Sequence, residues 1–172
     1  MPEPVQRGTA ANGHGIVLFI EGFDSIADPA SPTESEIAAG ERITYGLTPD
    51  GFTHDTSVAV ITTGRYTLDQ ALELDGIVTD TVEVQWVYNR ATPTDVELLL
   101  GKPGVEGYIV HALGYENGHD LEAGDTVNAI IPVTTGIPRD VPPTDNTELR
   151  KIQKLNVSGV VQREVTISGG GA

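Results

Sequence analysis

Histidines and carboxylates are the residues in this chain whose types could support chemistry. The pairs His54-Asp55 and His119-Asp120 resemble fragments of metal sites, but neither the His-x-His nor the His-Glu-x-x-His spacing occurs. Histidine and aspartate in such segments are typical of turns. We therefore expect no metal site at any of the four histidines, His14, His54, His111 and His119.

A cluster of oxygen ligands follows at Asp120, Glu122 and Asp125. Three carboxylates in a glycine-bearing turn are the one place where the spacing would suit weak calcium binding. The segment lacks the Asp-x-Asp-x-Asp-Gly pattern of a dedicated calcium loop. We expect a solvated turn.

Covalent and phosphate chemistry have even less support. The chain has no cysteine, which excludes a thiolate nucleophile and cysteine-based zinc sites. It has no Gly-x-Ser-x-Gly motif, and Gly101-Lys102-Pro103-Gly104 follows a predicted helix, whereas a phosphate loop precedes one. No spacing pairs two carboxylates for acid–base work. We expect no catalytic residue and no cofactor.

Charge divides the chain into an acidic body and a basic end. There are 25 acidic and 10 basic residues, and the formal net charge is −15. This balance excludes nucleic-acid binding by phosphate neutralisation, and it fits either simple solubility or a surface that repels polyanions. A basic end beside an acidic body favours association between copies. The basic residues of the last fifth are Arg139, Arg150, Lys151, Lys154 and Arg163.

Most of these basic residues lie in the final stretch of the chain, residues 149–168. From Leu155 its apolar residues alternate with polar ones, which predicts a long β-strand with one buried face and one wet face, bent or bulged at Gly159. Ordinary strands have about five or six residues, so this length suggests a barrel wall or a strand shaped for assembly. Further strands are predicted over 14–21, 42–45, 56–63, 66–74, 81–88, 105–113 and 126–135.

Two short helices interrupt the strands. Ser31 is expected to cap the first, with Pro32 at its first position, Glu34 completing a capping box and Gly40 ending it. Thr92 is expected to cap the second, which ends at Gly101. Pro132 in the strand over 126–135 indicates an edge or a break in the ladder. Residues 47–51 are typical of a turn, and residues 137–147 of a long stiff loop.

Together these elements predict a mainly β fold, a β-sandwich or barrel with one or two flanking helices. We expect an N-terminal arm over residues 1–13, one domain over 14–168 and a flexible tail over 169–172. The first residues lack the basic and apolar regions of a signal peptide. The longest apolar run, residues 16–20, is far shorter than the roughly 20 residues of a membrane helix, so we expect no membrane contact.

The order of these elements resembles that of the major tail proteins, or tail tube proteins, of long-tailed siphovirus-type phages of actinobacteria. The capped segment 31–40 is similar to that family's "Pro-Thr-x-x-Glu-Leu-x-Ala-Gly" stretch. Residues 95–110 are similar to its helix, "Pro-Gly-x-x-Gly" turn and strand, and residues 123–133 and 151–159 resemble its closing strands. The resemblance extends from about Ile16 to Ile167; residues 47–64 follow it loosely.

The resemblance implies a structural virion protein that assembles in the host cytoplasm. Hexameric rings of β-sandwich subunits would share a continuous inner β-barrel and stack into a tube, with closed barrels removing exposed sheet edges. DNA would pass through the lumen without specific binding, repelled by carboxylates on the inner strands. The partners would be further copies of the chain and other tail proteins: the tape measure, the tail terminator and the distal tail protein.

Two groups of residues are candidates for contacts in such a tube. We expect Arg150, Lys151, Lys154 and Arg163 to form salt bridges between subunits, and reversal of Lys151 and Lys154 to Glu to weaken assembly without changing the subunit fold. The proline-rich loop is the candidate for contacts between rings, as is the N-terminal arm. The loop residues concerned are Pro138, Arg139, Asp140, Pro142 and Pro143.

Other classes of protein remain open at this point. A tail terminator or the tube protein of a contractile system would use a related fold, and a terminator would form rings that cap the tube. A carbohydrate-binding β-sandwich would need an aromatic platform, for example Tyr66, Tyr88 and Tyr115 on one open face. An enzyme of the cupin or dUTPase type would need metal or phosphate ligands that the sequence does not supply.

Overall fold

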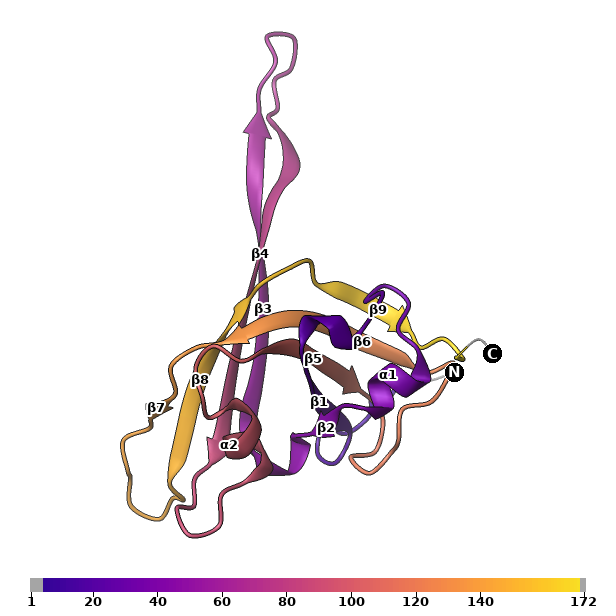
Figure 1. Ribbon diagram of the computed structural model, residues 1–172. Helices are drawn as coiled ribbons and strands as arrows, with labels where there is room; N and C mark the ends of the chain where they lie inside the picture. The colour runs from indigo at the N-terminus through magenta and orange to yellow at the C-terminus, as the bar shows by residue number, and fades with distance from the viewer. Residues whose placement is uncertain (1–4, 171–172) are drawn as a thin grey trace.

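The computed structural model describes residues 5–170 and shows a mainly β domain (Figure 1). Residues 1–4 of the predicted arm and 171–172 of the predicted tail lie outside the described part. The helices are α1 (Glu34–Ala38) and α2 (Asp95–Leu100), with single 3-10 turns η1 (Phe23–Ser25) and η2 (Thr44–Gly46). The strands are β1 (Gly15–Glu21), β2 (Glu41–Arg42), β3 (Leu47–Thr63), β4 (Leu72–Val87), β5 (Glu106–Leu113), β6 (Thr126–Thr135), β7 (Arg139–Asp140), β8 (Arg150–Val157) and β9 (Gln162–Thr166).

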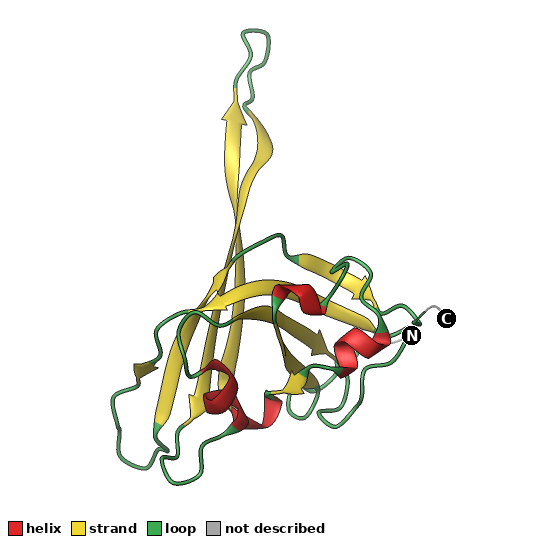
Figure 2. Ribbon diagram, in the orientation of Figure 1, coloured by secondary structure: helices red, strands yellow, loops and turns green. Residues whose placement is uncertain are grey.

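All the strands belong to one antiparallel sheet in the order β2-β1-β5-β6-β8-β4-β3, with β7 on β8 and β9 on β6. Figure 2 shows how the two short helices flank this sheet. The predicted mainly β class with short helices is confirmed. The sheet curls, so that apolar residues of β1, β5 and β6 pack in one cluster with those of β4 and β8.

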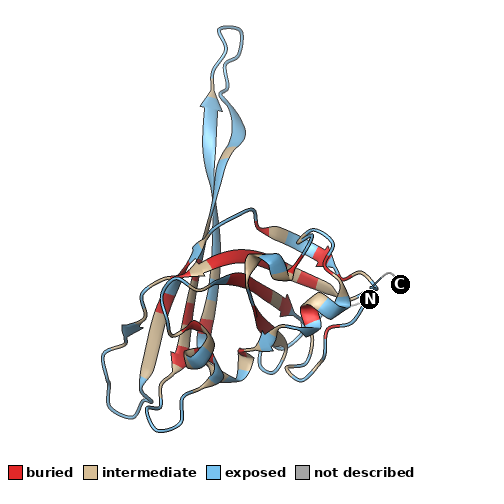
Figure 3. Cartoon of the chain, viewed as in Figure 1, coloured by how far each residue is buried: buried red, intermediate tan, exposed pale blue. Residues whose placement is uncertain are grey.

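Two hydrophobic cores cover the two faces of β1, β5 and β6 (Figure 3). The first core lies between these strands and β4–β8, and Trp86, Phe19 and Leu100 of α2 fill it. The second lies on the opposite face, under α1 and β9, and includes Ile37 and Ile167. Because β6 is covered on both faces, its middle, residues 129–133, is continuously apolar and buried, and does not alternate with polar residues.

Both helices begin two residues later than predicted. The N-cap of α1 is Thr33, whose hydroxyl accepts from the Glu36 N–H while the Glu36 carboxylate accepts from the Thr33 N–H, a complete capping box. Ser31 does not cap because the Pro32 carbonyl accepts from the Ser168 N–H, which keeps this segment extended.

The second helix shows the same shift. Its N-cap is Thr94, which accepts from the Glu97 N–H. Thr92 is held in a turn instead, because the Asn89 side chain accepts from the N–H groups of Ala91 and Thr92. Gly101 ends the helix as predicted.

The final stretch forms two strands, not one. β8 pairs with β4 and with the end of β6, whereas β9 pairs with the beginning of β6. The chain crosses between them at residues 158–161, where the predicted bend at Gly159 lies. Pro132 lies where β6 exchanges β9 for β8, so the predicted break in the ladder is confirmed. Leu155, Val165 and Ile167 are buried as predicted, but Leu155 belongs to the first core and the other two belong to the second, so they do not form one continuous buried face.

Four other predictions were wrong, at least in part, at the level of local structure. Of the predicted strand 42–45, only Arg42 belongs to a strand, the two-residue β2, and η2 follows; residues 66–71 are a turn, not a strand. The predicted turn at 47–51 lies inside β3 as a bulge between Leu47 and Phe52. Gly51 permits this bulge, because a Cβ there would meet the Gln85 carbonyl oxygen at 2.4 Å. The predicted loop 137–147 contains the short strand β7.

Candidate assembly surfaces

The β3–β4 hairpin extends well beyond the rest of the sheet (Figure 1). We call residues 57–79 the hairpin arm. Pairing of β4 with β8 ends at Val82, and β3 is the last strand of the sheet. Among residues 5–170, no strand therefore borders either edge of the hairpin arm. Its outward N–H and C=O groups are free to pair with another chain.

The hairpin arm is mostly exposed (Figure 3), and apolar side chains are exposed on both of its faces. Val58 and Ile61 are three residues apart on β3, and a register shift between β3 and β4 adds one residue to β4 between them. The cross-strand pairs Ile61–Leu74 and Val58–Val78 therefore point to opposite sides. These four are between 44% and 59% exposed. Water covers this apolar surface at a free-energy cost, and exposed apolar patches are typical of surfaces that bind other molecules. The other large apolar residues exposed on the arm are Val60, Tyr66, Leu68, Leu72 and Ile77.

Asp80 anchors the root of the hairpin arm. Its Oδ1 accepts hydrogen bonds from Thr56 Oγ1 at 2.7 Å, from His54 Nε2 at 3.0 Å and from Arg163 Nη2 of β9. Burial raises the pKa of Asp80, but the hydrogen bonds from Thr56, Arg163 and His54 outweigh it, so the pKa lies below its usual value. These bonds tie the root of the arm to β9.

An open groove of about 700 Å³ lies at the other end of β4. Its walls are the segment after β4, the segment that follows β7 and the beginning of β8. The groove combines positive charge with apolar surface, and Asp140 is its single carboxylate. We call it the basic groove. Its basic residues are Arg90, Arg150 and Lys151, and its apolar ones include Val141, Pro143 and Leu149.

Lys151 is already engaged within the subunit. Its Nζ donates to Glu97 Oε1 at 2.9 Å, and both side chains are 19% exposed. The other oxygen of Glu97 accepts from Trp86 Nε1 at 2.7 Å. The hydrogen bond with Glu97 raises the pKa of Lys151, and the Tyr88 ring, 4.3 Å from Nζ, also favours the charged form. Lys151 therefore holds α2 against β4 and β8.

Arg139 and Lys154 lie on the face of β4–β8 that points away from the first core. In the register of β4 and β8, Lys154 stands opposite Glu83, and Arg139 Nη2 lies 3.5 Å from Glu83 Oε1. Asp55 of β3 follows on the same face, because its neighbour Thr81 is two residues from Glu83. This face is polar, exposed and of mixed charge.

The histidines have structural surroundings. His111 packs at a tilt against Phe52, with ring centroids 4.5 Å apart. Burial, with a contribution from His54, lowers the pKa of His111 to about 4. His119 donates to Asp125 at 2.7 Å and stacks on Tyr115. No three histidine, aspartate or glutamate side chains within residues 5–170 gather as a metal site.

Asp125 acts as a turn builder in the carboxylate cluster. Its Oδ2 accepts from the Glu122 N–H at 3.0 Å as well as from His119, and these bonds lower its pKa. Asp120 points elsewhere, toward Arg42 at 3.3 Å. Two of the three carboxylates that suggested weak calcium binding, Asp120 and Asp125, thus serve separate bonds.

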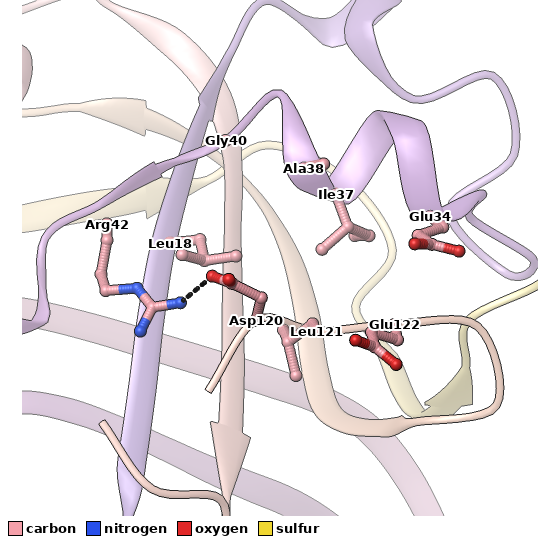
Figure 4. Close-up of a pocket in the computed structure, with 9 residues that line it drawn as sticks. All are labelled: Leu18, Glu34, Ile37, Ala38, Gly40, Arg42, Asp120, Leu121 and Glu122. Atoms are coloured by element: carbon pink, nitrogen blue, oxygen red, sulfur yellow. Dashed lines mark hydrogen bonds and ion pairs between the residues drawn. The ribbon is translucent and has the colours of Figure 1, made fainter. Parts of the chain in front are cut away.

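A pocket of about 460 Å³ lies between α1 and residues 120–122 (Figure 4). Leu18, Ile37 and Leu121 form its apolar part, and the Arg42–Asp120 ion pair lies at its side. The Asp120 side chain is 95% exposed, so water weakens this pair. The pocket lining, all within the described residues, offers no hydroxyl, thiol or imidazole for nucleophilic chemistry.

Comparison with known proteins decides the class of this molecule. The family model described as "Phage tail tube protein" matches residues 1–170. The chain belongs to the phage tail tube protein family. Comparison with curated proteins finds no match. A chain of the solved structure titled "Cryo-EM structure of the anti-feeding prophage (AFP) baseplate, 6-fold symmetrised" is similar in fold, with 13% identity and a TM-score of 0.52, over 92% of this chain and 98% of that one.

This tail tube protein is thus a structural component of a phage tail, and its family points away from catalysis. No helix within residues 5–170 is long and apolar enough to cross a membrane.

The structure distributes the predicted contact residues of the tail tube protein over three places. Arg150 and Lys151 line the basic groove with Asp140 and Pro143. Lys154 and Arg139 lie on the polar face, and Arg163 bonds Asp80 at the root of the hairpin arm. Pro138 is half-buried and Pro142 is exposed, both in the segments around β7.

Sequence reasoning missed the hairpin arm of the tail tube protein. Residues 56–63 and 72–79 are rich in β-branched and apolar residues, which is equally typical of a strand buried on both faces. One signal was available: Gly64 to Ala71 contains turn-forming residues between two strands of similar length. That signal predicts a hairpin, but not that the hairpin leaves the domain.

Proposed function

We propose that this chain is the major tail tube protein of a long-tailed siphovirus-type phage of actinobacteria, and that hexameric rings of it stack into a tube through which DNA passes. The observation that carries the proposal is the hairpin arm. A β-hairpin with two free edges and two apolar faces is a poor end state for a single subunit, because such edges template pairing between chains. Assembly would cover both.

The six-fold arrangement has separate support. The similar solved structure is titled "6-fold symmetrised", and its chain shares this fold over nearly its whole length. Family membership supports assembly with further copies and with other tail proteins. In the proposed virion these partners are the tape measure, the tail terminator and the distal tail protein, and assembly takes place in the host cytoplasm.

The polar face of β3, β4 and β8 is the proposed wall of the lumen. It carries Asp55 and Glu83 on strands that continue into the hairpin arm. Carboxylates there, within a chain of net charge −15, would repel phosphates and let DNA slide. Lys154 and Arg139 partly neutralise Glu83, so Asp55 would contribute more to this repulsion than Glu83.

The experiment is negative-stain electron microscopy of the purified, concentrated protein. We expect hollow tubes built of stacked six-fold rings. Rings that never elongate would instead favour a tail terminator or another ring-forming tail component, and a subunit that stays monomeric at all concentrations and with preformed tail complexes would contradict the proposal.

A further inference from the structure

We infer that the hairpin arm of one subunit lies in the basic groove of a second copy, in head-to-tail contact between successive rings. This inference rests on the proposed tube function and names the surfaces that would join the rings. The two surfaces occupy opposite ends of one strand: the arm contains the beginning of β4, and the basic groove starts just after its last residue, Val87.

Distance rules out contact within one subunit. Leu74 of the arm and Val87 lie about 40 Å apart along β4, at roughly 3.3 Å per residue. Figure 1 shows the hairpin arm at one extreme of the molecule and the segments around β7 and the beginning of β8 at the other. A contact between two different surfaces cannot form a two-fold symmetric pair, and because these two lie at opposite ends of the molecule, repeating the contact extends a filament.

The chemistry of the two surfaces is complementary. The arm carries one base, Arg65, against three acids, Asp69, Glu73 and Asp75. The basic groove carries Arg90, Arg150 and Lys151 against Asp140.

Lys151 is neutralised by Glu97, so Arg90 and Arg150 are the charges available to a partner. Glu73 and Asp75 alternate with Leu72 and Leu74, all four exposed. An acidic and apolar strand thus matches a groove with arginines and an apolar wall that includes Leu149, which is 53% exposed.

The first test uses charge reversal. Glu73→Lys with Asp75→Lys reverses the arm, and Arg90→Glu with Arg150→Glu reverses the groove. Each pair alone should raise the concentration of free subunit in equilibrium with tubes about tenfold at low salt, because two attractive ion pairs become repulsive. All four changes in one chain should restore it to within about threefold of the wild type. The charge-matched controls are Glu116→Lys with Glu122→Lys, and Lys102→Glu with Arg7→Glu, all at exposed residues outside both surfaces.

The second test uses the absence of cysteine from the chain. Leu74→Cys protein is mixed with Leu149→Cys protein, assembled and oxidised. We expect a disulfide-linked dimer of the two on a non-reducing gel, formed in tubes and not in dilute subunits, and no dimer when Leu149→Cys is replaced by Leu113→Cys. Thermal melting of each variant subunit checks that the fold is intact.

The outcomes separate the two proposals. If the wild-type protein forms no tubes under any condition, the proposed function fails. If tubes form, but the reversals have no more effect than their controls and Leu74→Cys does not link to Leu149→Cys, the arm lies elsewhere and this inference is wrong. Links between two Leu74→Cys chains would show that arms pair with each other, and would also overturn it.

Discussion

Replacing Lys151 should lower the stability of the single subunit, because Lys151 has its ion-pair partner inside the subunit. Lys151 bonds Glu97, which in turn bonds the buried Trp86, so Lys151→Met would leave a largely buried carboxylate without its cation. Exposed ion pairs contribute about 0.2–1 kcal/mol, and breaking buried ones costs about 3–5 kcal/mol. With both side chains 19% exposed, we expect a loss of about 2 kcal/mol, which lies between these limits.

Lys154→Met is the matched control. Lys154 is exposed on the same strand, and its replacement should change stability by less than about 0.5 kcal/mol. In a chain of this length each kcal/mol shifts Tm by roughly 2–4 °C, so Lys151→Met should lower Tm by about 4–8 °C. The measurement is thermal unfolding of dilute, unassembled subunits, followed by circular dichroism.

The pH dependence gives a second readout of the same bond. Because the hydrogen bond with Glu97 raises the pKa of Lys151, its contribution is fully present below the usual lysine value of about 10.4. This contribution is lost as the pH rises through the raised pKa of Lys151 in the folded protein. The reasoning would be refuted by equal Tm shifts for Lys151→Met and Lys154→Met. It would also be refuted if the Tm difference between the wild type and Lys151→Met did not shrink as the pH rises above about 10.4.

The bond between Lys151 and Glu97 also changes what is expected from reversing the charge of Lys151. Lys151→Glu would place a second carboxylate beside Glu97 and destabilise the subunit, so it cannot test assembly by itself. Lys154→Glu remains a test of contacts between subunits, because Lys154 is exposed on the polar face and its replacement should leave the fold intact.

Three further predictions concern the arm, the first helix and the acid range. Asp80→Asn should lower the free energy of unfolding by about 2 kcal/mol by weakening its bonds to Thr56, His54 and Arg163. Hydrogen exchange should then show faster opening at the root of the arm. Because the pKa of Asp80 is lowered, this stability is present above pH 3.9 or so, the usual aspartate pKa being about 3.9, and is lost as the pH falls through the pKa of Asp80 in the folded protein. Thr33→Ala should remove the cap of α1 and cost about 1 kcal/mol, measured by urea unfolding with Thr33→Ser as control. Because the pKa of His111 is lowered to about 4, the free energy of unfolding should fall as the pH is lowered from about 6.5 to about 4. In His111→Gln the midpoint of urea unfolding should depend less on pH over that range. The same pH dependence in both proteins would contradict this prediction.

Local sequence predicted much of the fold because its signals are short-range. Period-two alternation located β6 at Thr126–Thr135 and the buried positions Leu155, Val165 and Ile167. Pro132 marked the break in the ladder, since proline cannot donate a backbone hydrogen bond. The helix caps were misplaced by two residues, because partners distant in sequence such as Ser168 decide whether the residues before the caps stay extended.

By itself, then, the sequence determined a mainly β domain with two short helices, an acidic body with a basic end, and the absence of cysteine chemistry. The tertiary structure alone decided which apolar strand residues are covered and which are not. Residues 57–79 have the composition of a core strand, yet they project from the domain because β8 ends before it reaches them. The same structure gave Lys151 a partner inside the subunit and left Arg150 facing an open groove. Composition and spacing record the type of each residue, whereas burial and pairing depend on segments that meet only when the chain folds.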